Sequence, residues 1–210
     1  MINIAVLVLA AGKSSRMKTP KQLVKIGTNF LLETVLSKAK TINEKHVYCV
    51  LGANEALIKE EISASDIYFI YNPNFNEGLS SSIVSGISAL EMKRKNYDAV
   101  FVLLGDQPAI EKTYLKAMIS LFSKNESKII ASNYGKKLGV PAIFPKRYFL
   151  KLKKLSGDFG AKDILNKNKN VIALRKQTNY IDIDTVEDLK AFKKSILKLL
   201  FLHHAIYQIY

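Results

Sequence analysis

The chain has 210 residues, of which 48% are hydrophobic and 24% are charged. This composition suits a single α/β domain with a sizeable core and excludes intrinsically disordered and collagen-like chains, and no apolar run approaches the ~20 residues of a membrane span. The net charge is +14: residues 1–105 hold 12 basic and 9 acidic groups, and residues 106–210 hold 20 and 9. This asymmetry indicates either an anionic partner, such as nucleic acid, a membrane surface or a phosphorylated ligand, or a lysine-rich surface without a specific partner.

The spacing of apolar residues predicts strands that alternate with helices. In chain order, we expect a strand at 2–9, a helix at 29–42, a strand at 47–51, a helix at 54–62, a strand at 67–71, a helix at 80–95, a strand at 99–104, a helix at 111–123, strands at 128–132, 140–144, 171–174 and 180–183, and a helix from about 186. Such alternation predicts an α/β fold, with a Rossmann-like, mostly parallel, doubly wound sheet. The lysine-rich stretch 145–170 reads as the most loop-like region.

The two ends of the chain carry apolar segments. The first apolar run lacks the basic start of a signal peptide, so we expect a buried strand and a cytoplasmic protein. The apolar tail 199–210 could extend the last helix and dock on the sheet, bind a partner or be poorly ordered, and we favour docking. One domain, 1–198, is expected to precede this tail.

Cysteine and histidine are too scarce for several kinds of chemistry. Cys49 is the only cysteine and lies in the apolar run VYCVLG, which favours a buried core thiol. The three histidines are His46, His203 and His204. The sequence therefore offers almost no material for a Ser/His/Asp or Cys/His catalytic centre or for a structural zinc site.

The loop after the first strand has phosphate-binding chemistry. It reads LAAGKSSR at 9–16 and follows the carboxyl end of a strand, where α/β sheets bind ligands. It is neither a Walker A loop nor a three-glycine dinucleotide motif. The small residues Ala10, Ala11 and Gly12 leave backbone N–H groups accessible, and Arg16 and Lys21 supply cations. An ordinary turn with exposed cations is the alternative.

Three further segments place polar groups where a ligand could bind. Asp106 follows the most apolar strand, and Asp182 and Asp184 share one side of an extended segment before the last helix. Turn formation and helix capping are the alternatives. Three serines, Ser80, Ser81 and Ser82, begin a helix, where free N–H groups attract anions and where one serine would be enough for a cap.

These motifs resemble the nucleotidyltransferase superfamily. The signature is L-A-A-G-x-S-x-R-M followed by P-K-Q-L. The D-I-D-T-x-E-D-L segment also matches the superfamily pattern. The run N-P-x-x-x-E-G-L-S-S-S resembles the molybdenum cofactor cytidylyltransferase branch, as do G-V-P-A-I-F at 139–144 and L-S-G-D-F-G-A-K at 155–162. The resemblance spans roughly residues 3–192. It implies a three-layer α/β/α fold of the nucleotide-diphospho-sugar transferase type.

The resemblance also implies a role for each motif. Nucleotide binding would fall to about 1–110 and acceptor binding to about 111–198. Arg16 and Lys21 would neutralise a triphosphate, and Asp106 and Asp184 would hold Mg²⁺, which makes Arg16, Lys21 and Asp106 the candidate catalytic residues. The implied nucleotide-binding set is Leu9, Ala10, Ala11, Gly12, Arg16, Lys21, Ser80, Ser81 and Ser82. The implied acceptor-binding set is Gly139, Pro141, Gly157, Asp158, Gly160 and Lys162.

The resulting hypothesis is transfer of CMP from CTP to a molybdopterin-type cofactor, with release of pyrophosphate. CTP is favoured over GTP because Ala11 stands where guanylyl-transferring relatives usually have glycine. Val140 and Lys162 stand where characterised cytidylyltransferases often have His and Arg, which puts the acceptor in doubt. Another phosphorylated acceptor, such as a sugar phosphate, and a non-catalytic nucleotide-binding protein are the alternatives. We expect no nucleic acid or membrane partner; a molybdoenzyme or its chaperone is a possible protein partner.

Overall fold

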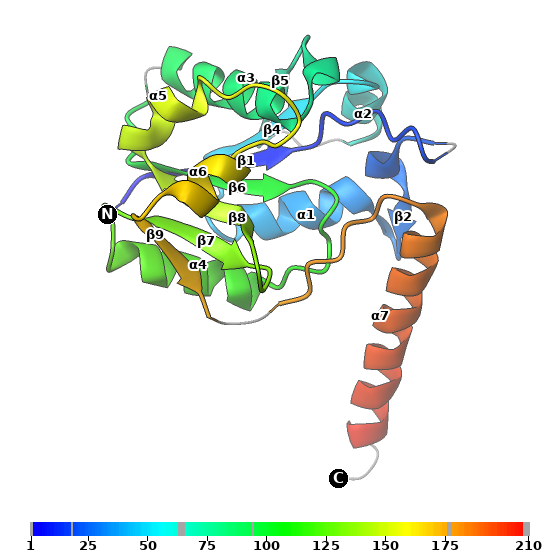
Figure 1. Cartoon of the computed structure of the whole chain (residues 1–210). Coiled ribbons are helices and arrows are strands. Elements are labelled where there is room, and N and C mark those ends of the chain that lie inside the picture. Colours follow the sequence, from blue (N-terminus) through cyan, green and yellow to red (C-terminus); the bar gives the residue numbers. More distant parts are fainter. Residues whose placement is uncertain (1, 18, 63–65, 94, 176–177, 208–210) are drawn as a thin grey trace.

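A seven-stranded sheet forms the centre of the protein (Figure 1). The computed structural model describes residues 2–17, 19–62, 66–93, 95–175 and 178–207, and from residue 198 onward it describes the backbone alone. The strands are β1 (Ile4–Leu9), β4 (Val47–Leu51), β5 (Ile67–Tyr71), β6 (Ala99–Leu104), β7 (Ile129–Asn133), β8 (Leu138–Pro145) and β9 (Val171–Leu174). Their order is β5-β4-β1-β6-β8-β7-β9, and only β8 runs antiparallel to its neighbours.

Helices cover both faces of this sheet. They are α1 (Leu31–Lys40), α2 (Glu55–Glu61), α3 (Leu79–Met92), α4 (Lys112–Ser123), α5 (Phe149–Leu152), α6 (Lys162–Lys167) and α7 (Val186–Tyr207). Val6 and Val8 of β1 pack with α1, α2 and α4, whereas the alternate residues Leu7 and Leu9 pack with α3, α5 and α6. The burial of β1 on both faces explains its continuous apolar sequence and confirms the predicted three-layer, mostly parallel architecture.

The structure corrects two predicted segments. Residues 180–183 do not form a strand: the N–H of Ile183 donates to the carbonyl of Asp106 at 2.9 Å, while Tyr180 stacks on Tyr134. Their alternating pattern therefore reflects side-chain packing and not a strand ladder. The lysine-rich stretch 145–170 is also more regular than predicted, because Phe149, Leu152 and Leu165 anchor the short helices α5 and α6 to the core.

Several short elements escape the sequence pattern. A 3₁₀ turn at Lys21–Leu23 and a two-residue hairpin, β2 (Lys25–Ile26) and β3 (Asn29–Phe30), connect the loop after β1 to α1. Another 3₁₀ turn, Phe75–Glu77, precedes α3. These elements are too short to show a helical or alternating period.

The last helix leaves the body of the protein. Phe192 packs with Leu31 and Ile183 in a separate small cluster, which holds the first turns of α7. The helix continues to Tyr207 and points away from the sheet (Figure 1). The tail thus extends the helix as expected, but the docking prediction is wrong for residues 199–207, and residues 208–210 lie outside the described part. Across the described residues, no helix has the length and apolarity to cross a membrane.

Candidate active site

The carboxyl ends of β1 and β6 bring the loop after β1 beside Asp106. Leu9 is paired with Leu104, so both strands end at the same level, and the N–H of Gly105 donates to the carbonyl of Leu9 at 2.9 Å. A Cβ on Gly105 would lie 2.9 Å from the Cβ of Ala10, so only glycine permits this close approach. The sheet edge therefore positions the two predicted motifs against each other.

A cavity of about 290 Å³ lies at this edge. The loop after β1, the residues after β6 and the start of α3 form its wall. Its lining consists of Leu9, Ala10, Ala11, Gly12, Lys21, Gln22, Phe75, Gly78, Leu79, Ser82, Leu104, Gly105 and Asp106. Most of the expected nucleotide-binding residues are therefore gathered around one space, although Arg16, Ser80 and Ser81 do not line it.

Gln22 braces the loop, and the sequence analysis missed it. Its side chain is buried, and its Nε2 donates to the carbonyls of Ala10 (2.8 Å) and Gly12 (3.0 Å). Its Oε1 accepts from the Ser14 hydroxyl at 3.2 Å, and that hydroxyl accepts from the backbone N–H of Lys21 at 2.9 Å. One side chain thus ties the loop to the turn that carries Lys21. The only signal in the sequence is the position of this glutamine next to Lys21 in P-K-Q-L.

Four charged side chains form one cluster, and two of them, Lys21 and Asp106, line the cavity. Lys21 Nζ lies 2.6 Å from Asp106 Oδ2 and 2.7 Å from Asp184 Oδ1, and Arg16 Nη2 lies 2.9 Å from Asp184 Oδ2. These contacts join residues up to 168 positions apart in the chain. The structure therefore brings together all of the expected catalytic and metal-binding residues.

The neighbouring charges determine how these groups titrate. Burial lowers the pKa of the Lys21 ammonium, but Asp106 and Asp184 outweigh burial, so the pKa is raised and the cation persists at neutral pH. Burial raises the pKa of Asp184, but Lys21 and Arg16 outweigh it, so the net direction is downward. The pKa of Asp182 is raised, mainly by burial and then by the charge of Asp106.

The donor set fits a divalent cation that also binds phosphates. Asp106 Oδ1 is buried and has no hydrogen-bond partner among the described residues, and Asp184 contributes a second carboxylate beside it. No group of three or more His, Cys, Asp and Glu side chains with the placement of a metal site occurs in the described ranges. Two carboxylates completed by substrate phosphates suit Mg²⁺ better than a metal held entirely by protein.

The three serines at the start of α3 have different surroundings. The hydroxyl of Ser80 donates to the Ser156 carbonyl at 3.1 Å, and that of Ser81 donates to the Gly78 carbonyl at 2.8 Å. Ser82 lines the cavity, and the buried Asn72 donates to both Ser81 and Ser82. The serine cluster thus anchors the helix start, with one member facing the cavity; the sequence analysis missed Asn72.

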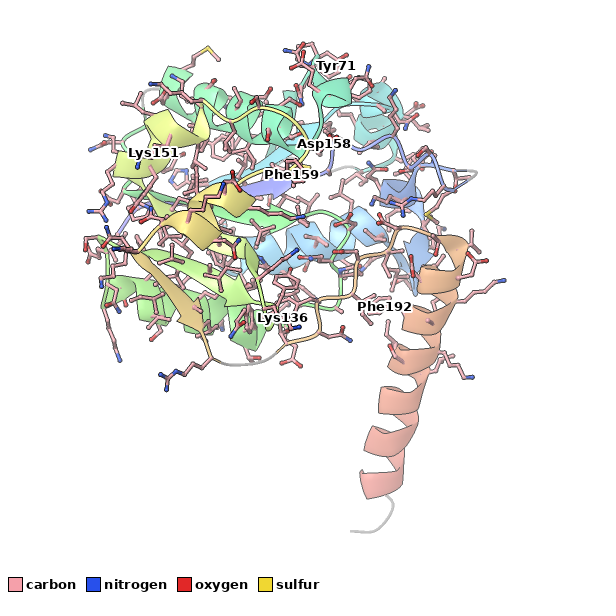
Figure 2. The ribbon with its side chains drawn as sticks, viewed as in Figure 1. Tyr71, Lys136, Lys151, Asp158, Phe159 and Phe192 are labelled. Carbon is pink, nitrogen blue, oxygen red and sulfur yellow. The ribbon has the colours of Figure 1, made fainter. Side chains whose placement is uncertain are left out.

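A second cavity, of about 790 Å³, adjoins the first and shares Leu9, Leu79 and Leu104 with it. Lysines from two parts of the chain line it: Lys136 and Lys137 on the turn between β7 and β8, and Lys162 at the start of α6. Figure 2 labels Lys136, and it also labels the exposed Phe159, which lines the same cavity. Asp163 and Asp182 line it too, so three cations and two carboxylates surround this large space next to the first cavity.

The expected acceptor residues divide into two groups. Gly139 and Lys162 line the second cavity, whereas Pro141, Gly157, Asp158 and Gly160 do not. The loop with Asp158 (Figure 2) packs closely against the start of α3. A Cβ placed on Gly78 would lie only 1.9 Å from Asp158 Oδ1. Pro141 contributes its carbonyl, which accepts from the Ser132 hydroxyl at 2.8 Å.

Gln107 links the second cavity to the segment before α7. Its Nε2 donates to Asp182 Oδ1 at 2.8 Å and to the Tyr134 hydroxyl at 3.0 Å. Gln107, Tyr134 and Asp182 all line the second cavity. Sequence reasoning singled out Asp182 but missed the two partners, since they become neighbours only in the folded chain.

Solved structures of similar proteins match nearly the whole chain. The homologue of Rv0371c from Mycobacterium sp. strain JC1 is 25% identical and matches with a TM-score of 0.78, over 93% of this chain and 98% of that one. Rv0371c of Mycobacterium tuberculosis in complex with manganese (22% identity, TM-score 0.71) matches over 92% and 99%. CMP:2-keto-3-deoxy-manno-octonic acid synthetase complexed with CTP (13%, 0.72) matches over 93% and 99%. These matches confirm the expected nucleotide-diphospho-sugar transferase type of fold.

The sequence comparisons identify the family. The bifunctional protein GlmU of Pseudomonas putida is 28% identical over 121 residues, which are 57% of this chain and 25% of that protein. The chain thus spans about a quarter of the length of this curated relative. The model of the MobA-like NTP transferase domain matches residues 6–171. Since this match covers most of the sequence, the chain belongs to the family of MobA-like NTP transferase domains.

Proposed function

We propose that the protein transfers CMP from CTP to a phosphorylated small molecule, a molybdopterin-type cofactor, and releases pyrophosphate. The observation that carries this proposal is the meeting of Lys21, Arg16, Asp106 and Asp184 beside the phosphate-binding loop. Family membership supports nucleotidyl transfer. The choice of CTP rests on Ala11, and a structural neighbour that holds CTP supports it.

The reaction requires an in-line displacement at the α-phosphorus. A phosphate oxygen of the acceptor forms a new bond to phosphorus while the bond to the β-phosphate oxygen breaks, and pyrophosphate leaves with that electron pair. The acceptor is already an anionic nucleophile, so no histidine base is needed. The work of the protein is positioning and charge neutralisation.

Each charged residue has a part in this step. The guanidinium of Arg16 and the ammonium of Lys21 offset charge on the triphosphate and on the leaving pyrophosphate. Asp106 and Asp184 would hold Mg²⁺, which supplies charge stabilisation to the phosphates. A solved neighbour in complex with manganese supports a divalent ion in this family; magnesium is our proposal.

The second cavity is the proposed acceptor site. We also propose that residues 1–198 form one domain, in which about 1–110 bind the nucleotide and about 111–198 bind the acceptor. Lys136, Lys137 and Lys162 would attract an acceptor with more than one anionic group. A phosphorylated sugar is the second candidate, because a putative glucose-1-phosphate thymidylyltransferase from Bacillus anthracis has the same fold (15% identity, TM-score 0.71). A cytoplasmic location and delivery of product to a molybdoenzyme or its chaperone complete the proposal.

Variants of the charged residues test the proposal. Asp106→Ala should lower kcat by roughly 100-fold to 1,000-fold, the usual cost of removing one transition-state contact. Arg16→Ala should raise the KM for the nucleotide and lower kcat. Glu91→Gln, which removes a carboxylate that lines neither of the two cavities, is the control and should behave as wild type. Near-normal, metal-dependent turnover by Asp106→Ala would refute the metal role of this residue.

A further inference from the structure

The Lys21 ammonium lies between the two carboxylates proposed to bind metal. It contacts Asp106 at 2.6 Å and Asp184 at 2.7 Å, and its side chain is only 14% exposed. The other cation of the group, Arg16, contacts Asp184 alone, and its side chain is 65% exposed. Lys21 is therefore the cation that bridges both carboxylates from inside the protein.

The position of Lys21 is fixed from its backbone. Lys21 begins a 3₁₀ turn, and its N–H donates to the Ser14 hydroxyl, which in turn donates to the buried Gln22. The ammonium is thus positioned by a turn that hydrogen bonds hold in place, unlike the ammonium of an exposed surface lysine. Its flexible four-carbon stem still allows the charged end to change partner without movement of that turn.

The charges of this group balance. Asp106 and Asp184 contribute two negative charges, and Lys21 and Arg16 contribute two positive charges. Adding a divalent cation alone would give these four residues and the ion a net charge of +2, which the neighbouring Asp182 offsets only in part. The cation would also have to compete with an ammonium for the same carboxylate oxygens. A nucleoside triphosphate changes this balance, since its phosphates offer new anionic partners to Lys21 and Arg16.

We infer that Lys21 holds Asp106 and Asp184 in place in the nucleotide-free protein and keeps a free divalent cation out. The phosphates of an incoming nucleotide draw the ammonium away, so the metal enters together with the nucleotide. Lys21 thereby couples metal binding to nucleotide binding, in addition to its contact with the triphosphate. This inference rests on the proposed metal role of the two aspartates.

Binding of Mn²⁺ alone tests the inference. The loss of the electron paramagnetic resonance signal of free Mn²⁺ reports binding without any turnover. We expect Lys21→Met and Lys21→Gln to bind Mn²⁺ at least tenfold more tightly than wild type when no nucleotide is present. Lys21→Arg, which keeps the cation, and Lys25→Met, which removes an exposed lysine that does not line either cavity, should bind as weakly as wild type.

Two controls separate this inference from the proposed function. Adding Asp106→Asn to Lys21→Met should abolish the gain in Mn²⁺ affinity. If the double variant still binds tightly, the metal role of Asp106 is wrong. If neither Lys21→Met nor Lys21→Gln gains affinity, while wild type with CTP binds Mn²⁺ in a manner that depends on Asp106, the metal site stands and the gating role of Lys21 is overturned. A thermal melt shows whether Lys21→Met and Lys21→Gln are folded. The gating role of Lys21 is judged on whichever of these two variants folds.

Discussion

Replacing Gln22 by methionine should loosen the phosphate-binding loop without emptying the space that the glutamine fills. The side chains are similar in length, but methionine cannot make the three hydrogen bonds to Ala10, Gly12 and Ser14. A buried hydrogen bond contributes about 1 kcal/mol net, so the free energy of unfolding should fall by about 2–3 kcal/mol. For a chain of this size, that corresponds to a lowering of Tm by about 4–12 °C.

The same substitution should weaken nucleotide binding, because the loop carbonyls and the turn with Lys21 lose their common brace. We expect the Kd for CTP, measured by calorimetry, to rise about tenfold, which corresponds to ~1.4 kcal/mol. Asn125→Ala is the matched control, since it removes one hydrogen bond, to the Leu121 carbonyl at the end of α4, and should lower Tm without changing the Kd. A Gln22→Met protein with the Tm and CTP affinity of wild type would refute the bracing role.

Two further predictions concern the elements around the site. Gly78→Ala should destabilise the protein more than Gly135→Ala, because both glycines have a positive φ but only Gly78 has Asp158 in the space of a new Cβ; equal losses in urea denaturation would contradict this close approach. Hydrogen bonds from the Thr185 hydroxyl and nearby backbone N–H groups lower the pKa of Asp188. A carboxylate whose pKa is lower in the folded state stabilises the protein above its unfolded pKa of about 4, and this stability is lost as the pH falls through its folded pKa. The destabilisation by Asp188→Asn should therefore be full at pH 6 and shrink below pH 4. A destabilisation that is constant from pH 6 to pH 2.5 would show that the carboxylate charge is not responsible.

Strands that are buried on both faces could be predicted from the sequence. The continuous apolar runs of β1 and β6 reflect contact with helices on both sides of the sheet, and Asp106 stands out because a charge follows such a run. Strand ends also locate the ligand edge of an α/β sheet, so the loop after β1 and Asp106 can be predicted to lie at the same edge.

Contacts between distant segments could not be predicted in this way. Gln22 and Gln107 make their hydrogen bonds where loops meet in the folded chain. A polar residue outside the regular helices and strands belongs to no helical or alternating pattern, so the sequence does not single it out. Residues 180–183 alternate like a strand because their side chains meet different neighbours: Tyr180 stacks on Tyr134, and Ile183 enters the cluster under α7. Alternation predicts burial there, but it does not predict a backbone partner.

The most direct test of the proposed function is to identify the product by mass. The protein would be incubated with Mg²⁺, each of the four nucleoside triphosphates in turn, and either molybdopterin or a sugar 1-phosphate. We predict a product that carries one added CMP, with an equal amount of pyrophosphate, from CTP and molybdopterin. Turnover with GTP but not CTP would contradict the nucleotide assignment, a product from the sugar phosphate alone would contradict the acceptor, and no adduct from any pair would contradict nucleotidyl transfer to these two acceptors.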